Sequence, residues 1–273
     1  MQTRAFINNE WVGASSGKTF TVTNPATDEH LADVPDLSAG EVTDAVAAAY
    51  DAFPAWSART AEDRCGLLDR LYDLIQRDTD RLADLMTREQ GKPLAEAKGE
   101  IAYAASFLRN AAEEGKRLEG DILPASAPEK RILVMKQPVG VCSAITPWNF
   151  PSAMITRKIG PALAVGCTTL IKPAEDTPLS ALALGELCLE AGIPAGVVNL
   201  VTGDPETVTG PMLTDSRVRK LTFTGSTEVG KILLKKAAEN VLRTSMELGG
   251  HAPLIVFDDA DLDVAIPAAI ACK

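Results

Sequence analysis

The sequence predicts an α/β protein built on a parallel sheet with helices on both faces. Between residues 139 and 257, short segments rich in β-forming residues alternate with helical segments, the pattern of strands joined by helical crossovers. Ligands of such sheets bind beyond the carboxyl ends of the strands, so the polar residues there become candidate site residues. The predicted strands are VGVCSAIT (139–146), TTLIK (168–172), VVNLV (197–201), KLTFT (220–224), RTSMEL (243–248) and APLIVF (252–257).

The expected helices begin and end at recognisable residues. One helix should follow Ser38, because Glu41 lies three residues later, the spacing of a capping box. A second helical stretch should follow Thr60, be interrupted at 91–93 by Gly-Lys-Pro, and resume to about Lys116. Further helices are expected after Pro151, from Pro178 to a stop at Gly192, from Pro205 to Leu213, and from Ser226 to Glu239.

Two other regions favour extended structure. The first 35 residues are expected to form short strands and turns, because β-formers alternate there with Asn, Gly and Pro. Residues 120–138 should form a hairpin arm of two strands joined by a loop that contains Pro and Ser. Such an arm has too few partners to be stable alone, and its edges favour pairing with another chain.

Composition excludes several classes of protein. The chain has 273 residues, of which 46% are hydrophobic and 23% charged, which argues against disorder. Its net charge of −10 disfavours nonspecific binding to nucleic acid, and no apolar run reaches the ~18 residues of a membrane-spanning helix. Five scattered cysteines and two histidines indicate neither a disulfide scaffold nor a metal site. We therefore expect a soluble, reduced, cytoplasmic protein without nucleic-acid, membrane or metal partners.

One glycine-containing segment resembles the phosphate-binding loop of nucleotide triphosphatases. Gly225 to Lys231 follows a predicted strand and opens a helix, as such loops do. The next residue is Ile232, whereas that loop needs Ser or Thr to give magnesium a hydroxyl, so a triphosphatase is a remote alternative. The dinucleotide fingerprint G-x-G-x-x-G is absent. Backbone N–H groups beside Gly225 nevertheless suit a pyrophosphate; the alternative is that Gly225 is only a turn residue.

Four motifs together resemble the aldehyde dehydrogenase superfamily. The resemblance extends over the whole chain, and two further segments, SAMITRKIGPALAVGC and MELGGHAPLIVFDDADLD, are similar to its succinate-semialdehyde dehydrogenase branch. It implies a Rossmann-like NAD(P)-binding domain over 1–249, with the arm at about 120–138 used for oligomerisation. It also implies that 250–273 begin a second, truncated α/β catalytic domain. The four motifs are ITPWNFP (145–151), IKPAEDTP (171–178), FTGSTEVG (223–230) and MELGG (246–250).

The resemblance implies NAD(P)-dependent oxidation of an aldehyde to a carboxylic acid, with succinic semialdehyde as the expected substrate. A cysteine thiolate forms a thiohemiacetal, hydride passes to the nicotinamide, and water hydrolyses the thioester. Asn149 corresponds to the oxyanion donor and Glu247 to the base that activates water. Arg157 corresponds to the arginine that binds the distal carboxylate of a semialdehyde. The residues alone also permit a helix cap at Asn149 and solvated surface charges at Glu247 and Arg157.

The resemblance also implies a cofactor site. Lys172 and Glu175 correspond to the pair that holds the adenosine ribose; alternatively they form an exposed ion pair of little energetic value. A carboxylate at Glu175 would bind both ribose hydroxyls and repel a 2′-phosphate, which favours NAD while leaving NADP possible. The remaining cofactor-lining positions are Thr146, Pro147, Trp148, Pro173, Ala174, Gly203, Thr224, Gly225, Ser226 and Leu248.

The family's catalytic cysteine has no counterpart in this sequence. It lies in an F-x-N-x-G-Q-x-C segment about thirty residues beyond the glutamate, and the sequence ends at Lys273, before that segment. We therefore expect the isolated chain to be inactive, to expose apolar surface near its end and to be poorly soluble, with homo-oligomers in the intact enzyme. A non-catalytic nucleotide-binding or subunit-interaction chain is the alternative. Cys272 has the wrong context, and buried hydrophobic roles are expected for Cys65, Cys142, Cys167 and Cys188.

Overall fold

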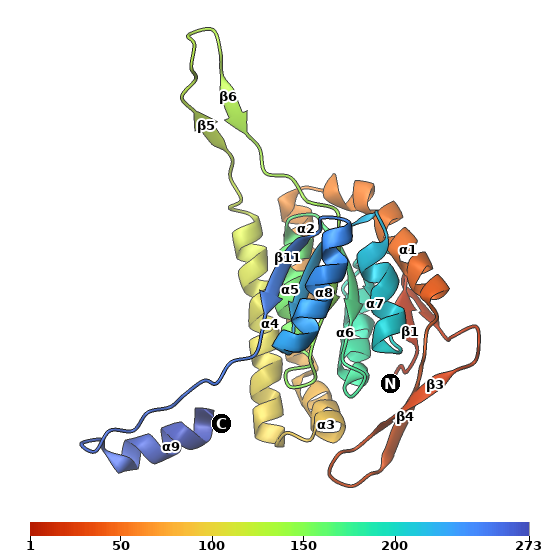
Figure 1. The fold of residues 1–273 in the computed structure, drawn as a ribbon, viewed down its shortest axis with the longest axis vertical. Helices are drawn as coiled ribbons and strands as arrows, with labels where there is room; N and C mark the ends of the chain where they lie inside the picture. Colours follow the sequence, from red (N-terminus) through yellow and green to blue (C-terminus); the bar gives the residue numbers. More distant parts are fainter. Residues whose placement is uncertain (273) are drawn as a thin grey trace.

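A seven-stranded sheet runs through the centre of the molecule (Figure 1). Its strands follow the order β11-β10-β7-β8-β9-β1-β2. The computed structural model describes residues 1–272; Lys273, the last residue of the predicted second domain, lies outside them. The sheet is parallel from β11 to β9, while β1 and β2 add an antiparallel edge. Its strands are β1 (Ala5–Ile7), β2 (Glu10–Val12), β7 (Val141–Ile145), β8 (Thr168–Lys172), β9 (Val198–Leu200), β10 (Val218–Thr224) and β11 (Arg243–Glu247).

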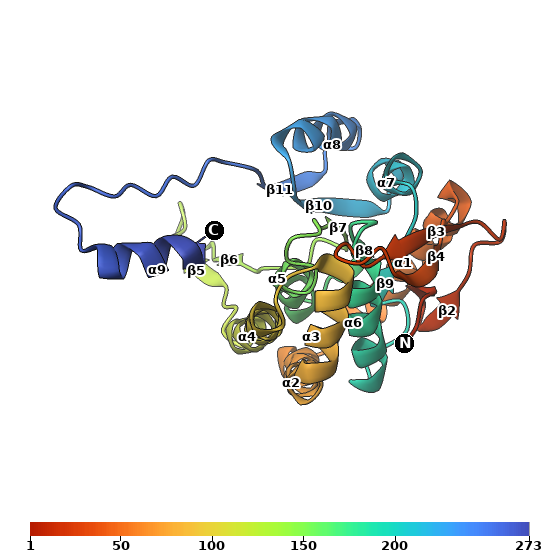
Figure 2. The same cartoon turned by 90° about the horizontal axis from the view of Figure 1, so that it is seen from below.

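Helices cover both faces of this sheet, so the predicted α/β fold is confirmed (Figure 2). Each layer has its own apolar cluster. One face carries α1 (Ala39–Ser57), α7 (Pro205–Thr214) and α8 (Thr227–Glu239). The other carries α2 (Ala61–Arg77), α3 (Thr79–Gln90), α4 (Leu94–Gly115), α5 (Ala153–Ala164) and α6 (Pro178–Glu190).

The second layer of helices leaves one part of the sheet uncovered. Side chains alternate between the two faces of a strand, and Met246 of β11 packs into the cluster below α8. Arg243, Ser245 and Glu247 therefore lie on the opposite side, where all three are exposed. This uncovered side of β10 and β11 adjoins α5 and is important for both cavities described below.

The predicted helix ends form as local hydrogen bonds require. Ser38 accepts a hydrogen bond from the N–H of Glu41, and the Glu41 carboxylate accepts one from the N–H of Ser38, which completes the capping box. Thr60 and Ser226 cap α2 and α8 without a reciprocal bond, by accepting from the N–H groups of Asp63 and Val229. Gly192 follows α6 with a φ of +81°, a left-handed conformation that favours glycine.

Two expectations about elements need correction. The helical stretch after Thr60 is divided at Asp78, which ends α2, begins α3 and forms ion pairs with Arg77 and Arg81. The prediction of a strand over 252–257 is wrong. Among residues 1–272, this segment belongs to none of the three sheets, because the chain leaves the main sheet after Glu247 and runs away from the body (Figures 1 and 2).

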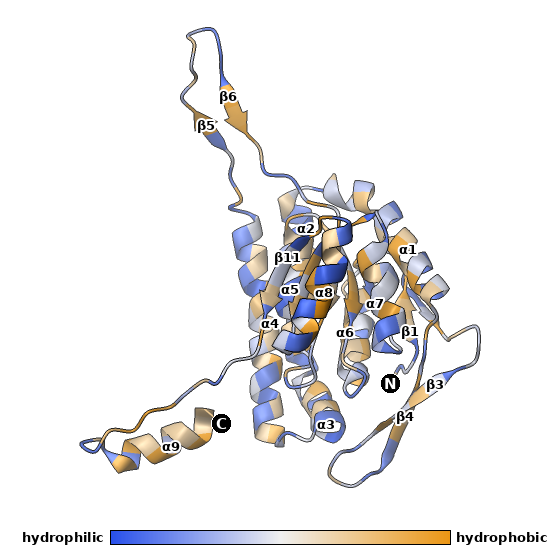
Figure 3. Cartoon of the chain, viewed as in Figure 1, coloured by the Kyte–Doolittle hydropathy of each residue, from blue (hydrophilic) through white to orange (hydrophobic). Residues whose placement is uncertain are grey.

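The carboxyl-terminal segment exposes apolar side chains, as expected. Ile255 and Phe257 are each 71% exposed. The helix that follows, α9 (Leu262–Cys272), has no buried residue, although its sequence is mostly apolar (Figure 3). Within residues 1–272, no helix has both the length and the apolar character needed to cross a membrane.

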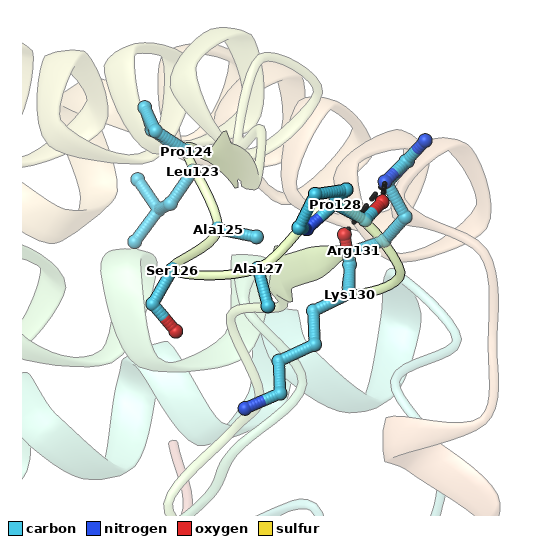
Figure 4. Close-up of a pocket in the computed structure, with 8 residues that line it drawn as sticks. All are labelled: Leu123, Pro124, Ala125, Ser126, Ala127, Pro128, Lys130 and Arg131. Atoms are coloured by element: carbon cyan, nitrogen blue, oxygen red, sulfur yellow. Dashed lines mark hydrogen bonds between the residues drawn. The ribbon is translucent and has the colours of Figure 1, made fainter.

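Two hairpins lie outside the main sheet: β3 (Thr19–Thr23) with β4 (His30–Pro35), and β5 (Asp121–Leu123) with β6 (Ile132–Val134). The second is the predicted arm, and it projects from the body (Figure 1). Its loop bends around a hollow of about 450 Å³, where the Arg131 guanidinium donates to the carbonyl oxygens of Pro128 and Lys130 (Figure 4). None of the predicted site residues lines this hollow.

Candidate active site

Four parallel strands end together at one edge of the sheet. β7 and β8 end in register, and the N–H of Thr146 donates to the carbonyl oxygen of Lys172 at 3.1 Å. Thr224 of β10 is paired with Glu247 of β11, and the N–H of Gly225 donates to the carbonyl oxygen of Glu247 at 3.1 Å. Residues predicted from separate strand ends are therefore neighbours in space.

A pocket of about 330 Å³ opens at this edge. It brings together Asn149, Arg157 and Glu247, which come from the turn after β7, from α5 and from the end of β11. Three groups with complementary chemistry thus face one space: a neutral amide donor, a cation and a carboxylate. The complete lining is Pro147, Trp148, Asn149, Met154, Arg157, Thr224, Gly225, Glu247, Leu248 and Gly249.

Arg157 is oriented by an aromatic ring. Its guanidinium carbon lies 5.4 Å from the centroid of the Phe107 ring on α4. In the part of the chain that the structure describes, Arg157 forms no ion pair, and it is exposed. A guanidinium held in this way keeps its planar set of N–H donors available for a carboxylate ligand.

Sequence reasoning missed the two residues that hold the turn carrying Asn149. The Glu100 carboxylate, on a residue 3% exposed, accepts hydrogen bonds from the N–H groups of Ser152 (3.0 Å) and Ala153 (3.2 Å). The Lys92 ammonium pairs with Glu100 and donates to the carbonyl oxygen of Asn149 at 2.9 Å. The only sequence pattern at either residue was Gly-Lys-Pro at 91–93, which the sequence analysis interpreted as a break between helices.

Lys158 is a third residue that the sequence did not reveal. Its ammonium donates to the hydroxyl oxygens of Thr222 (3.2 Å) and Thr224 (2.7 Å) on β10. Burial lowers the pKa of Lys158 to about 8, although the negative charge of Glu247 opposes that shift. A cation that titrates near neutral pH therefore lies beside the pocket. No pattern in the sequence distinguished Lys158 from its neighbour Arg157.

Lys172 and Glu175 form an ion pair beyond the end of β8. The Lys172 ammonium lies 2.6 Å from a Glu175 carboxylate oxygen and also donates to the carbonyl oxygen of Pro173 at 3.1 Å. The Lys172 side chain is only 4% exposed, whereas that of Glu175 is 44% exposed. The pair is therefore half-buried, with one carboxylate edge available to a ligand. Glu175 and Trp148 line a neighbouring pocket of about 290 Å³.

Several features of this edge fit a dinucleotide. The buried hydroxyl oxygen of Thr146 has no hydrogen-bond partner in the described protein. Gly225 lines the pocket, but packing explains its glycine, because a Cβ atom there would lie 2.4 Å from the Phe223 ring. Ser226 caps α8, so the N–H groups of Thr227 and Glu228 have no acceptor within that helix and suit a phosphate.

Not every predicted cofactor residue lines these pockets. Gly203 is buried, and a Cβ atom there would lie 2.9 Å from both the Asp36 carboxylate and the N–H of Leu37, so packing explains its glycine. Pro173 and Ala174 form the link between Lys172 and Glu175, and Ser226 stands at the start of α8.

No cysteine among residues 1–272 lines the pocket that contains Asn149. The four cysteines expected to be buried are free and buried, and Cys272 is exposed: Cys65, Cys142, Cys167 and Cys188 form the buried set. In the same described residues, no group of three or more His, Cys, Asp or Glu side chains is arranged to hold a metal ion.

Comparison with known proteins agrees with this architecture. The model of the aldehyde dehydrogenase family matches residues 11–273. The chain is 57% identical over 270 residues to a glutarate-semialdehyde dehydrogenase of Pseudomonas putida, covering 99% of this chain and 56% of that protein. It is 55% identical over 270 residues to an NADP(+) succinate-semialdehyde dehydrogenase of Escherichia coli, with the same two coverages.

A solved structure gives the same result for the fold. Betaine aldehyde dehydrogenase from Staphylococcus aureus, in complex with NAD⁺, superimposes with a TM-score of 0.96 at 35% identity, covering 99% of this chain and 55% of that one. The chain therefore belongs to the aldehyde dehydrogenase family. Its most similar relatives include semialdehyde dehydrogenases, and it spans about half the length of the curated relatives it matches.

Proposed function

We propose that this site serves the NAD(P)-dependent oxidation of an aldehyde that carries a distal carboxylate, such as succinic semialdehyde, as part of a longer protein. The observation that carries the proposal is the presence of Asn149, Arg157 and Glu247 around one pocket at the carboxyl edge of the sheet. The names of the relatives support it, because glutarate and succinate semialdehydes both bear an aldehyde at one end and a carboxylate at the other.

Each of the three groups has one task in this proposal. Arg157 binds the distal carboxylate and so orients the aldehyde. The Asn149 amide donates a hydrogen bond to the aldehyde oxygen as it becomes negative, and a neutral donor does so without pairing with a thiolate. The Glu247 carboxylate removes a proton from the water that hydrolyses the acyl intermediate.

The cofactor and the nucleophile complete the proposed reaction. Glu175 and Lys172 would hold the adenosine ribose, and the start of α8 would hold the pyrophosphate. When bound, the dinucleotide supplies the acceptor for the two electrons that the aldehyde loses. A cysteine thiolate that forms a thiohemiacetal must come from outside residues 1–272, because no cysteine among them lines the Asn149 pocket. We therefore propose that the 273-residue polypeptide alone has no turnover.

The available carboxylate of Glu175 supports a preference for NAD over NADP. A 2′-phosphate on the ribose would approach this negative charge, whereas two free hydroxyls would donate to it. The relatives include one named for NADP(+) and a structure in complex with NAD⁺, so both cofactors occur among similar proteins.

We further propose that residues 1–249 form the dinucleotide-binding domain and that 250–273 begin a second domain. The sheet ends at β11, and the exposed apolar residues of the following segment need a partner. The hairpin arm has the same property, since Ile122 is 79% exposed and Leu133 66% exposed. We propose that it pairs with a second copy of this chain in a homo-oligomer.

The decisive experiment compares two aldehydes in the full-length protein. Arg157→Gln should lower kcat/KM for succinic semialdehyde about a hundredfold, equivalent to about 2.7 kcal/mol, and change kcat/KM for butanal less than about threefold. Arg157→Lys should give an intermediate loss, because it keeps the charge and loses the planar fork of donors. Arg70→Gln, an exposed residue of α2, is the matched control.

Two outcomes would contradict the proposal. Equal losses for both aldehydes in Arg157→Gln would remove the carboxylate-binding role. Turnover of succinic semialdehyde by the 273-residue polypeptide would show that the nucleophile lies within it, and a cysteine replacement series would then identify the residue.

A further inference from the structure

A second cavity, of about 410 Å³, lies between α5 and the uncovered side of β10 and β11. Apolar residues of α5, among them Pro161 and Val165, form one wall, and the sheet forms the other. Cys142 of β7 and Cys167, which directly precedes β8, both line this cavity. Neither cysteine has a task in the proposed aldehyde chemistry.

Cys142 lies on β7 and Cys167 directly precedes the neighbouring strand β8, so both line the same cavity, but their surroundings differ. The Cys142 thiol, which donates to the carbonyl oxygen of Gly140 at 3.8 Å, and the N–H groups of Gly140 and Val139 are the donors beside the Cys167 sulfur. These donors, with the nearby positive charge of Lys220, stabilise a thiolate and lower the pKa of Cys167, although burial opposes them. The pKa of Cys142 is raised, because its proton is shared with the Cys167 sulfur and its site is buried.

The charged groups that face the cavity favour an anion there. Arg157 and Lys158 come from α5, Lys220 from β10 and Glu247 from β11, which gives three cations and one carboxylate. Cys188 has no such surroundings: burial alone raises its pKa to about 12. Within residues 1–272, Cys167 therefore lies in a cationic cavity beside backbone donors, whereas Cys188 is only buried.

We propose that Cys167 and Cys142 form a reactive dithiol, which takes small peroxides and alkylating agents that enter this cavity. The Cys167 thiolate attacks one peroxide oxygen, so an S–O bond forms and the O–O bond breaks. The departing oxygen takes up a proton and leaves as water, or as an alcohol from an organic peroxide. Cys167 is then a sulfenic acid.

Cys142 resolves this product. Its sulfur attacks the Cys167 sulfur, an S–S bond forms, the S–O bond breaks, and the hydroxide leaves as water with the Cys142 proton. Two thiols are thereby oxidised by two electrons in all, and one peroxide is reduced. Because the cavity also contains Arg157 and Glu247, the modified cysteines would alter a space next to the proposed aldehyde site. The dithiol itself does not depend on the proposed function.

The first test measures alkylation of the unsubstituted chain by iodoacetamide, with peptide mass spectrometry for each cysteine and circular dichroism to confirm the fold. At about pH 6.5, Cys167 should react at least tenfold faster than the buried Cys188. Between about pH 6.5 and 8.5 the rate at Cys188 should rise about tenfold per pH unit, because burial raises its pKa, while the rate at Cys167 should change less. An equal rate at Cys167 and Cys188 in the folded chain would overturn the proposal.

The second test uses hydrogen peroxide. The unsubstituted chain should yield a disulfide between the peptides that contain Cys142 and Cys167, reversed by dithiothreitol. Cys142→Ser keeps a hydroxyl donor but cannot form the bond, so dimedone should trap sulfenic acid at Cys167. Cys65→Ser is the matched control and should behave as the unsubstituted chain. A disulfide formed only in urea, or persistent sulfenic acid with Cys142 present, would overturn the resolving role.

Discussion

Glu100 connects the buried side of α4 to the turn that carries Asn149. Its carboxylate receives two backbone N–H groups and the Lys92 ammonium, and both charged side chains are largely removed from water. A buried ion pair contributes little when it replaces a well-packed apolar pair, but the loss of one partner leaves a buried charge unpaired. The Asn149 backbone thus depends on a residue far from it in sequence.

Glu100→Gln should lower the free energy of unfolding by about 3 kcal/mol, because Lys92 loses its buried counter-charge. Urea denaturation measures this loss. Glu96→Gln, on the exposed side of the same helix, should change stability by less than about 0.5 kcal/mol. Similar values for the two variants would show that Glu100 does not hold the turn.

Because of Lys158, the free energy of unfolding should depend on pH in the alkaline range. Its folded-state pKa of about 8 lies below the usual lysine value. Below pH 8 the ammonium is charged and buried, so its full destabilising effect on the folded state is present. That cost disappears as pH rises toward about 10.5, where the unfolded lysine also loses its proton. The free energy of unfolding therefore contains a term that rises between these two pH values.

Lys158→Met should remove this term and raise stability at neutral pH. The measurement is chemical denaturation at several pH values from 7 to about 10, each compared with the unsubstituted protein. Lys235→Met, at an exposed position of α8, is the matched control and should leave the pH dependence unchanged. A parallel dependence in both variants would contradict the assignment.

Without the family resemblance, the residues predict the candidate site only at the strand ends. Lys172 and Glu247 lie at the ends of β-forming segments and Asn149 follows another, so their arrival at one edge follows from parallel pairing. Arg157, on α5, was predicted only through the resemblance. The contact of Lys92 and Glu100 with the Asn149 turn depends on how α4 packs against α5, which no local pattern encodes. Burial of Lys158 depends likewise on the distance between α5 and β10.

At the level of elements, capping residues predicted the starts of helices correctly, whereas β-forming residues did not predict whether a neighbouring strand would be present. Ser38, Thr60 and Ser226 start helices because their side chains satisfy N–H groups within three residues. The strand predicted over 252–257 failed because β-forming residues describe a preference, whereas a strand also needs a neighbour. The division at Asp78 was hidden because helix-favouring residues continue on both sides.

Two glycines show that the space around a glycine decides whether its replacement by alanine lowers or raises stability. Gly196, with a φ of +77°, would place a Cβ atom 2.5 Å from the carbonyl oxygen of Ala48 in α1, whereas a Cβ at Gly66 within α2 would have no atom within 4 Å. Gly196→Ala should destabilise the protein by more than about 2 kcal/mol. Gly66→Ala should stabilise it by about 0.5–1 kcal/mol. Thermal denaturation compares them, and shifts in the same direction would contradict this account.

At the scale of the whole molecule, many of the exposed large apolar side chains belong to two projections, the hairpin arm and the segment after β11. Leu133→Glu on the arm should shift the protein toward smaller species in sedimentation velocity, because it places a charge in the proposed contact with a second copy. Ser126→Glu adds the same charge at the exposed loop of the arm and should have no effect. Unchanged sedimentation of Leu133→Glu would contradict the role of the arm.

The position of β1 and β2 in the sheet has a consequence for synthesis of the protein. Phe6 pairs with Leu200, and the N–H of Leu37 donates to the carbonyl oxygen of Thr202. The segment that contains β1 and β2 therefore has no place to dock until translation has passed residue 200. At typical elongation rates this segment stays unprotected for roughly 10–40 s, an interval in which a chaperone that binds nascent chains could hold it.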